Sequence, residues 1–88
     1  MKSFKAIVKD PTGLHARPAT LLVQAATKFK SKTTIKTQTG ATGDAKSIIN
    51  LMALAVKQGD SFEVIFEGED EDQAIEAVKK SLEDNKII

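Results

Sequence analysis

One short segment of this chain brings together residue types that handle phosphoryl groups. It reads GLHARPA over residues 13–19, and His15 is the only histidine among the 88 residues. Histidine is the residue type that changes charge near neutral pH, and a neutral imidazole can attack phosphorus. Arg17, two residues further on, supplies a planar fork of donors that suits phosphate. The segment predicts a site that holds a phosphoryl group on an imidazole.

A helix predicted to follow this segment would strengthen such a site. The first amides of a helix, here those of Ala16 and Arg17, have no acceptor within the helix and point toward any anion placed before it. The helix dipole contributes about 0.3–2 kcal/mol more for a negative charge at that position. Arginine at a helix start opposes the dipole, and a bound anion would relieve this penalty. Taken singly, His15 also fits a surface or capping histidine, and Arg17 a solvated side chain.

Composition narrows the class of protein. The chain carries a net charge of +1 and 41% hydrophobic residues, which is typical of a globular domain without bulk attraction to nucleic acid. It contains no cysteine, which excludes disulfides and thiolate metal sites. We expect no metal and no cofactor. No apolar run of signal or membrane-spanning length is visible, which favours a cytoplasmic protein without membrane insertion. The length predicts one domain, 1–88.

Hydrophobic periodicity places seven elements along the chain. Residues 2–9, 33–38 and 61–67 alternate as half-buried strands, and residues around 39–43 predict a hairpin turn with a short third strand. Helical spacing predicts a helix over 16–28, a second one from Ser47 to near Gln58-Gly59, and a third after Asp70. Asp70 and Gln73 resemble a capping box, and residues 30–32 read as a solvated connector.

The resulting order, β-α-β-β-α-β-α, predicts an α+β open sandwich. Strands that alternate between apolar and polar residues indicate a sheet with one solvated face and one face covered by helices. Phe4, Ala6 and Val8 are expected on the covered face of the first strand, and Phe62, Val64 and Phe66 on that of the last.

The second helix carries a candidate modification site and a candidate partner surface. Ser47 fits an ordinary N-cap, and it also fits a phosphorylation site, because a helix start tolerates added negative charge. A short helix cannot bury all the apolar residues that follow, so some of Ile48, Leu51 and Met52 should be exposed. Exposed apolar clusters are typical of partner surfaces.

The histidine segment, extended to Thr20, and the later segment KSIINLM over residues 46–52 together resemble the HPr phosphocarrier family of the bacterial sugar phosphotransferase system. The resemblance spans the whole chain. It implies a four-stranded antiparallel sheet with three helices on one face. It also implies a carrier cycle in which enzyme I, charged from phosphoenolpyruvate, passes a phosphoryl group to Nδ1 of His15. The carrier then passes this group to the IIA domain of a sugar permease, with a covalent phosphohistidine and no independent turnover.

The resemblance also implies site residues and partners. Arg17 would steady the phosphate, and Ser47 matches the serine modified by an ATP-dependent HPr kinase/phosphorylase, which links the family to carbon catabolite regulation through a transcription regulator. We expect a monomer that uses no nucleic acid. The implied docking surface consists of Thr20, Gln24, Ile48, Leu51 and Met52.

Two other classes of function fit part of the pattern. One is a non-catalytic regulatory paralogue that acts by protein binding, or a small ligand-binding domain of similar fold. A member that acts only as a regulator is expected to lack the histidine. A nucleic-acid-binding domain would need an aromatic sheet face and a basic surface, whereas the phenylalanines here alternate inward.

Overall fold

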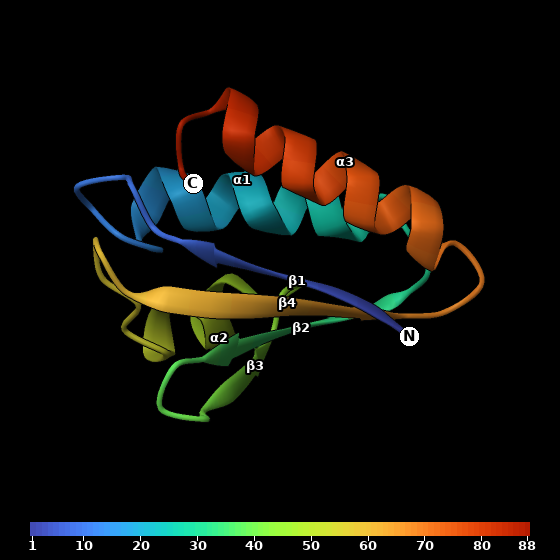
Figure 1. Ribbon diagram of the computed structural model, residues 1–88, viewed down its shortest axis with the longest axis horizontal. Coiled ribbons are helices and arrows are strands. Elements are labelled where there is room, and N and C mark those ends of the chain that lie inside the picture. Colours follow the sequence, from blue (N-terminus) through green and yellow to red (C-terminus); the bar gives the residue numbers. More distant parts are fainter.

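The fold is built around one strand, β4 (Ser61–Glu67), which pairs with two others. The computed structural model describes residues 1–88, and all seven elements occur in the predicted order (Figure 1). The remaining elements are β1 (Lys2–Ile7), α1 (Ala16–Thr27), β2 (Lys32–Thr37), β3 (Thr42–Asp44), α2 (Ile48–Ala53) and α3 (Glu71–Asp84). None of the three helices has the length and apolar character needed to span a bilayer.

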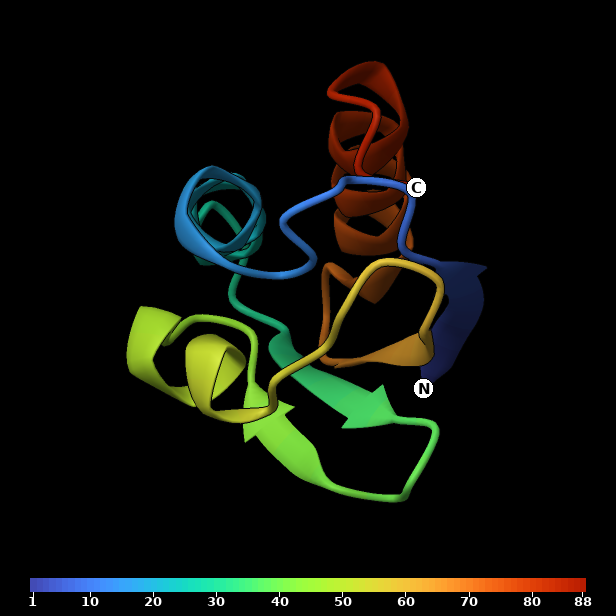
Figure 2. The same ribbon diagram turned by 90° about the vertical axis from the view of Figure 1, so that its left-hand side faces the viewer.

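All four strands form one antiparallel sheet in the order β1-β4-β2-β3. Val64 is the middle of β4 and faces Phe4 of β1 on one side and Ile35 of β2 on the other. Figure 2 shows the three helices on one side of the sheet, with β1 and β3 as its outer strands. The predicted open sandwich is confirmed.

The covered face of the sheet is the one that alternation predicted. Phe62, Val64 and Phe66 are buried, and the ring of Phe66 stacks on that of Phe4 with centroids 6.1 Å apart. The helices contribute buried stripes that include Leu22 on α1 and Val78 on α3. Because β2 and β4 bury alternate side chains and β1 half-buries Phe4 and Ala6, the opposite face of the sheet remains open to solvent.

The predicted end of the second helix is wrong. The helix ends at Ala53 rather than near Gln58, and Ala55 has a left-handed backbone with φ 53°. The carbonyl of Val56 accepts a hydrogen bond from Leu14 N–H at 3.0 Å, far back in the chain. A continued helix would direct this carbonyl along its own axis, so the chain leaves the helix to meet the loop before α1.

The third strand is short, as predicted, and its neighbours give the reason. A Cβ built on Gly43 would lie 3.1 Å from a methyl carbon of Leu54 and 3.4 Å from the carbonyl oxygen of Asn50. The absent side chain lets α2 approach β3 closely. Gly43 thus marks a helix-packing position within the sheet.

The predicted capping box at α3 is also wrong. The Asp70 side chain makes no capping bond; its carboxylate accepts hydrogen bonds from the Lys30 amide (2.8 Å), the Ser31 amide (2.9 Å) and the Ser31 hydroxyl. Ser31, expected in a solvated connector, is completely buried. A Cβ on Gly68 would lie 2.7 Å from the Ser31 Cα, so the α1–β2 and β4–α3 connections are packed together and joined by Asp70.

Asp70 makes stability depend on pH. Hydrogen bonds from the Ser31 hydroxyl and the Lys30 amide lower the pKa of Asp70 below its usual value. A carboxyl whose pKa is lowered by folding stabilises the folded state above its unfolded pKa of about 3.9, and this contribution is lost as the pH falls through the folded value. We therefore expect Asp70→Asn to lower the melting temperature by several degrees at pH 7 and by much less at the lowest pH at which both proteins fold.

Thermal melts followed by circular dichroism across this pH range test the prediction. The matched control is Glu69→Gln, since Glu69 is the exposed neighbouring carboxylate. An equal loss for Asp70→Asn at every pH would mean that the carboxylate charge contributes nothing.

Candidate functional site

His15 is the N-cap residue of α1 and is exposed to solvent. Its backbone is extended, with φ −124° and ψ 156°, and its side chain makes no capping hydrogen bond. No other residue of the chain is hydrogen-bonded to the imidazole. His15 therefore occupies the N-cap position, but its side chain does not cap the helix. Both ring nitrogens are open to a partner or a ligand.

The backbone after His15 leaves two donors free. Neither the Ala16 nor the Arg17 amide has an acceptor within the chain, and Pro18 has no N–H. Ala16 has φ 49°, a left-handed conformation that costs a residue with a Cβ roughly 1–2 kcal/mol. Its carbonyl accepts a hydrogen bond from the Thr20 hydroxyl at 3.1 Å. A strained backbone at this point is the kind of feature that accumulates at functional sites.

The loop that carries His15 is held from both sides. Asp10 accepts hydrogen bonds from the amide and hydroxyl of Thr12, at 2.9 and 2.7 Å, and these bonds lower the pKa of Asp10. Gly13 has φ 67°, and a Cβ there would lie only 2.3 Å from the carbonyl oxygen of Val56. The next residue, Leu14, is buried. Gly13 is needed both for its left-handed backbone and for this close approach.

Arg17 reaches the opposite end of the chain. Its guanidinium donates to the side-chain oxygen of Asn85 at 3.3 Å, and Asn85 is the C-cap residue of α3. The Asn85 amide nitrogen in turn donates to the carbonyl of Ser81 at 2.8 Å, which fixes the side chain. The positive charge of Arg17 also contributes to the lowered pKa of Asp10. The sequence contained no signal for Asn85, because 68 residues separate it from Arg17.

A depression of about 280 Å³ lies beside the imidazole. Sequence reasoning missed the segment that forms one of its walls, Ala55, Val56, Lys57 and Gln58; the opposite wall comes from Pro11 and Thr12. The sequence prediction extended the second helix to about Gln58, so it placed these residues in a helix and not beside His15. The helix in fact ends at Ala53, and Ala55 then turns the chain with a left-handed backbone. The site is thus an exposed imidazole with two free amides next to it in the chain and a shallow recess beside it, while the nearby Arg17 side chain is directed to Asn85.

Ser47 is the N-cap of α2, as one of its two interpretations predicted. Its hydroxyl accepts hydrogen bonds from the amide and the side chain of Asn50, both at 3.2 Å. The preceding residue, Lys46, donates from Nζ to the carbonyl of Phe29 at 2.7 Å, just beyond the end of α1. The start of α2 is therefore attached to α1.

Part of the predicted docking surface is corrected by the structure. Leu51 is completely buried and packs in the core, so a partner cannot contact its side chain. Ile48, Ile49 and Met52 are exposed, at 39%, 80% and 38%. Helical geometry explains the difference, because Leu51 is the one position among these that faces the sheet. On α1, which lies beside α2, Gln24 is exposed and Thr20 is half-buried (Figure 2).

Nothing in the chain resembles a metal centre: no three acidic or histidine side chains are placed together to hold an ion.

Comparison with known proteins identifies the family. Residues 2–84 match the family model described as the PTS HPr component phosphorylation site. The phosphocarrier protein HPr of Mycoplasma genitalium is 47% identical over 88 residues, covering 100% of both chains. A solved mycoplasma histidine-containing phosphocarrier protein has a TM-score of 0.94 and 44% identity, covering 99% of this chain and 98% of that one. The HPr-like protein Crh of Halalkalibacterium halodurans is 46% identical over 76 residues, covering 86% of this chain and 89% of the relative. The chain belongs to the HPr family of phosphocarrier proteins.

Proposed function

We propose that this protein accepts a phosphoryl group from enzyme I on Nδ1 of His15 and passes it to IIA domains of sugar permeases. The observation that carries the proposal is the exposed imidazole of His15, which has no partner within the chain and adjoins the two free amides of Ala16 and Arg17. A nucleophile that must be reached by two different proteins has to be exposed, and its product needs donors nearby.

The proposed transfer exchanges one bond to phosphorus for another. The Nδ1 lone pair attacks the phosphorus held on enzyme I, the new P–N bond forms as the bond to enzyme I breaks, and the electron pair returns to enzyme I. The second step reverses these roles with the IIA domain as acceptor. In the phosphorylated state the phosphoryl oxygens accept hydrogen bonds from the free amides, and the helix dipole adds about 0.3–2 kcal/mol. Such modest stabilisation holds the group without preventing its release.

Arg17 would neutralise the phosphoryl group in both steps. In the unmodified protein its guanidinium is hydrogen-bonded to the neutral oxygen of Asn85, at a long 3.3 Å. A hydrogen bond to a charged phosphoryl oxygen is roughly twice as strong as one between neutral groups. The guanidinium is thus expected to exchange Asn85 for the phosphoryl group when His15 is modified.

The proposed docking surface lies on α1 and α2. It contains Thr20 and Gln24 on the first helix and Ile48 and Met52 on the second, with Ile49 added because it is 80% exposed and with Leu51 removed. Exposed apolar side chains of this kind are costly to leave in water and are commonly covered by a partner.

We further propose that Ser47 is a regulatory phosphorylation site for a dedicated kinase. A phosphate on Ser47, the N-cap residue of α2, would carry a charge of about −1.5 to −2 next to Ile48. Because a helix start tolerates negative charge, the fold should survive the modification, and the effect should appear in binding. A partner that desolvates Ile48 would also have to desolvate the new charge.

A regulatory role without phosphoryl transfer is the second candidate, since a solved relative, Crh of Bacillus subtilis, is described as a catabolite repression HPr. The retained and exposed His15 favours the carrier. The two functions are separated by whether the imidazole accepts phosphate.

Removal of the imidazole tests the central proposal. His15→Ala should fold normally, because the His15 side chain contacts no partner, and it should take up no label from phosphoenolpyruvate and enzyme I. The label on the wild-type protein should be acid-labile and base-stable, as a phosphoimidazole is. Normal labelling of the alanine variant, or no labelling of the wild-type protein, would reject the carrier function.

Arg17→Ala should separate transfer from stability. Arg17 is exposed, so the free energy of unfolding should change by under about 0.5 kcal/mol. Loss of a charge-assisted hydrogen bond of about 1.5–3 kcal/mol should slow transfer by about 10-fold to 100-fold. Rapid-quench rates of His15 labelling, together with thermal melts, measure both. Lys80→Ala, which removes an exposed cation from α3, away from the proposed docking surface, is the control and should leave transfer unchanged.

The charge at Ser47 can be varied while the cap is kept. Ser47→Asp and Ser47→Asn both retain an N-cap residue, so they differ chiefly in charge. We expect Ser47→Asp to remain folded but to be labelled on His15 several-fold more slowly, at a higher apparent KM for the carrier. Ser47→Asn should behave as wild type. Equal rates for the two variants at equal stability would leave Ser47 as a cap only.

A further inference from the structure

The outer edge of β1 has backbone groups that nothing in the chain uses. Just after β1, the Val8 N–H donates to the Asp60 carbonyl, and the Val8 carbonyl accepts from the Gly59 N–H. In an antiparallel pair every second residue bonds to the partner strand, so the even residues of β1 are the ones hydrogen-bonded to β4. The amides and carbonyls of Ser3, Lys5 and Ile7 therefore point away from β4, toward the open edge. All three residues are exposed. A row of unpaired groups along an edge strand is a template for another strand.

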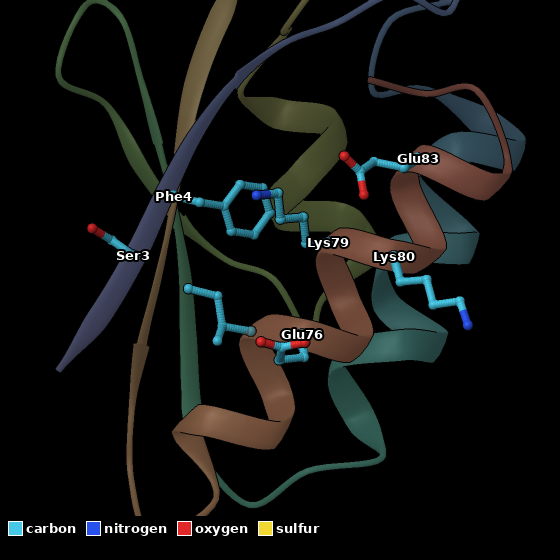
Figure 3. A pocket seen from close by; sticks show the side chains of 7 residues that line it. Ser3, Phe4, Glu76, Lys79, Lys80 and Glu83 are labelled. Atoms are coloured by element: carbon cyan, nitrogen blue, oxygen red, sulfur yellow. The ribbon is translucent and has the colours of Figure 1, made fainter.

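A groove of about 420 Å³ runs beside this edge, between β1 and α3 (Figure 3). Phe4 and Ile75, both half-buried, are its two apolar lining residues, and the other five are polar or charged: Ser3, Glu76, Lys79, Lys80 and Glu83. Figure 3 shows Glu76, Lys79 and Glu83 directed from α3 toward β1, whereas Lys80 points away. The side chains of an added strand that face the helices would lie in this groove.

Beyond each end of the groove, β1 or the residues after it are attached to α3 or the residues that follow it. Lys2 Nζ and the Asp72 carboxylate form an ion pair at 3.1 Å, and at the other end Lys9 N–H donates to the carbonyl of Ile87 at 2.7 Å. These contacts hold α3 alongside β1 while leaving the stretch between them free. The open edge therefore has a fixed length, from Ser3 to Ile7.

The solvent face of the sheet indicates the charge of an added strand. Lys36 of β2 faces Glu63 of β4, and Glu63 faces Lys5 of β1, so the row alternates in sign and ends at the edge with a cation. Opposite charges on directly paired positions stabilise a sheet, and like charges oppose pairing. The position beside Lys5 on an added strand thus favours a carboxylate.

A second copy of β1 fits this edge poorly. The antiparallel register that pairs all three free residues would place Lys5 opposite Lys5 of the other copy. At the other edge of the sheet, β3 has only three residues.

We propose that the β1 edge and its groove bind an extended segment of a partner protein, with carboxylate side chains on one face and apolar side chains on the other. The segment adds a fifth strand by hydrogen bonds to Ser3, Lys5 and Ile7. Its apolar face lies over Phe4 and Ile75, and a carboxylate lies beside Lys5. This surface shares no residue with the His15 site, so its occupation is independent of phosphoryl transfer.

The experiment uses the full chain, labelled with nitrogen-15, and a short blocked peptide that alternates glutamate and valine. Addition of this peptide should shift and protect from exchange the amides of Ser3, Lys5 and Ile7. A peptide with lysine in place of glutamate should bind about fivefold more weakly. Lys5→Glu should reverse this preference, whereas Lys36→Glu, in the same row but away from the edge, should retain it.

A second variant tests the backbone directly. Proline is tolerated in an edge strand where its N–H would face solvent, so Ser3→Pro should fold and lose peptide binding by about fivefold or more. The inference is overturned if the β1 amides do not respond to millimolar peptide, if Lys5→Glu leaves the preference unchanged, or if the amides shift with protein concentration alone, which would identify a second copy as the occupant. Labelling of His15 by enzyme I should be unaffected by Lys5→Glu, so failure here leaves the carrier function intact.

Discussion

The backbone of Gly13 lies directly against that of Val56, and the position of His15 depends on this contact. The neighbouring Leu14 amide donates to the same Val56 carbonyl at 3.0 Å, and its side chain is buried. The loop before α1 is thereby attached to the segment after α2, although more than forty residues separate them. This attachment accounts for the short α2, the left-handed Ala55 and the recess beside the imidazole. A flexible loop could expose a histidine equally well, but it would not keep the two free amides beside it.

A second attachment fixes the helices that carry the proposed docking surface. Lys46 Nζ lies on the carbonyl of Phe29, close to the end of α1, where the helix dipole is negative and a cation is favoured. Ser47 then begins α2, so the proposed regulatory position and the exposed Ile49 are held relative to α1. The His15 site and Ser47 therefore lie at the starts of two helices that are attached to each other, on the helical side of the molecule.

Local patterns in the sequence predicted the fold well, and long-range contacts account for what they missed. Strand β4 has the predicted bounds because Phe62, Val64 and Phe66 alternate along one face. His15 and Arg17 were found because they lie within one segment. Asp70 shows where a local pattern fails. Its spacing to Gln73 fits a capping box, but its carboxylate instead accepts a hydrogen bond from the hydroxyl of Ser31, which is distant in sequence. Asn85 and the Val56 carbonyl could not have been found for the same reason. Leu51 was misplaced because the apolar run of α2 covers every side of a short helix, and periodicity alone does not say which side meets the sheet.

Two left-handed alanines flank the imidazole, Ala16 in the chain and Ala55 across the recess. This geometry limits which residues each position can accept over evolutionary time. A β-branched or bulky side chain would make the left-handed backbone a severe outlier, whereas glycine would adopt it freely. Glycine, however, also enlarges the unfolded ensemble and loosens the link between the nucleophile and its cation. Position 16 thus favours residues that tolerate a left-handed backbone, which are glycine, asparagine and aspartate, while alanine holds the site at some cost in strain.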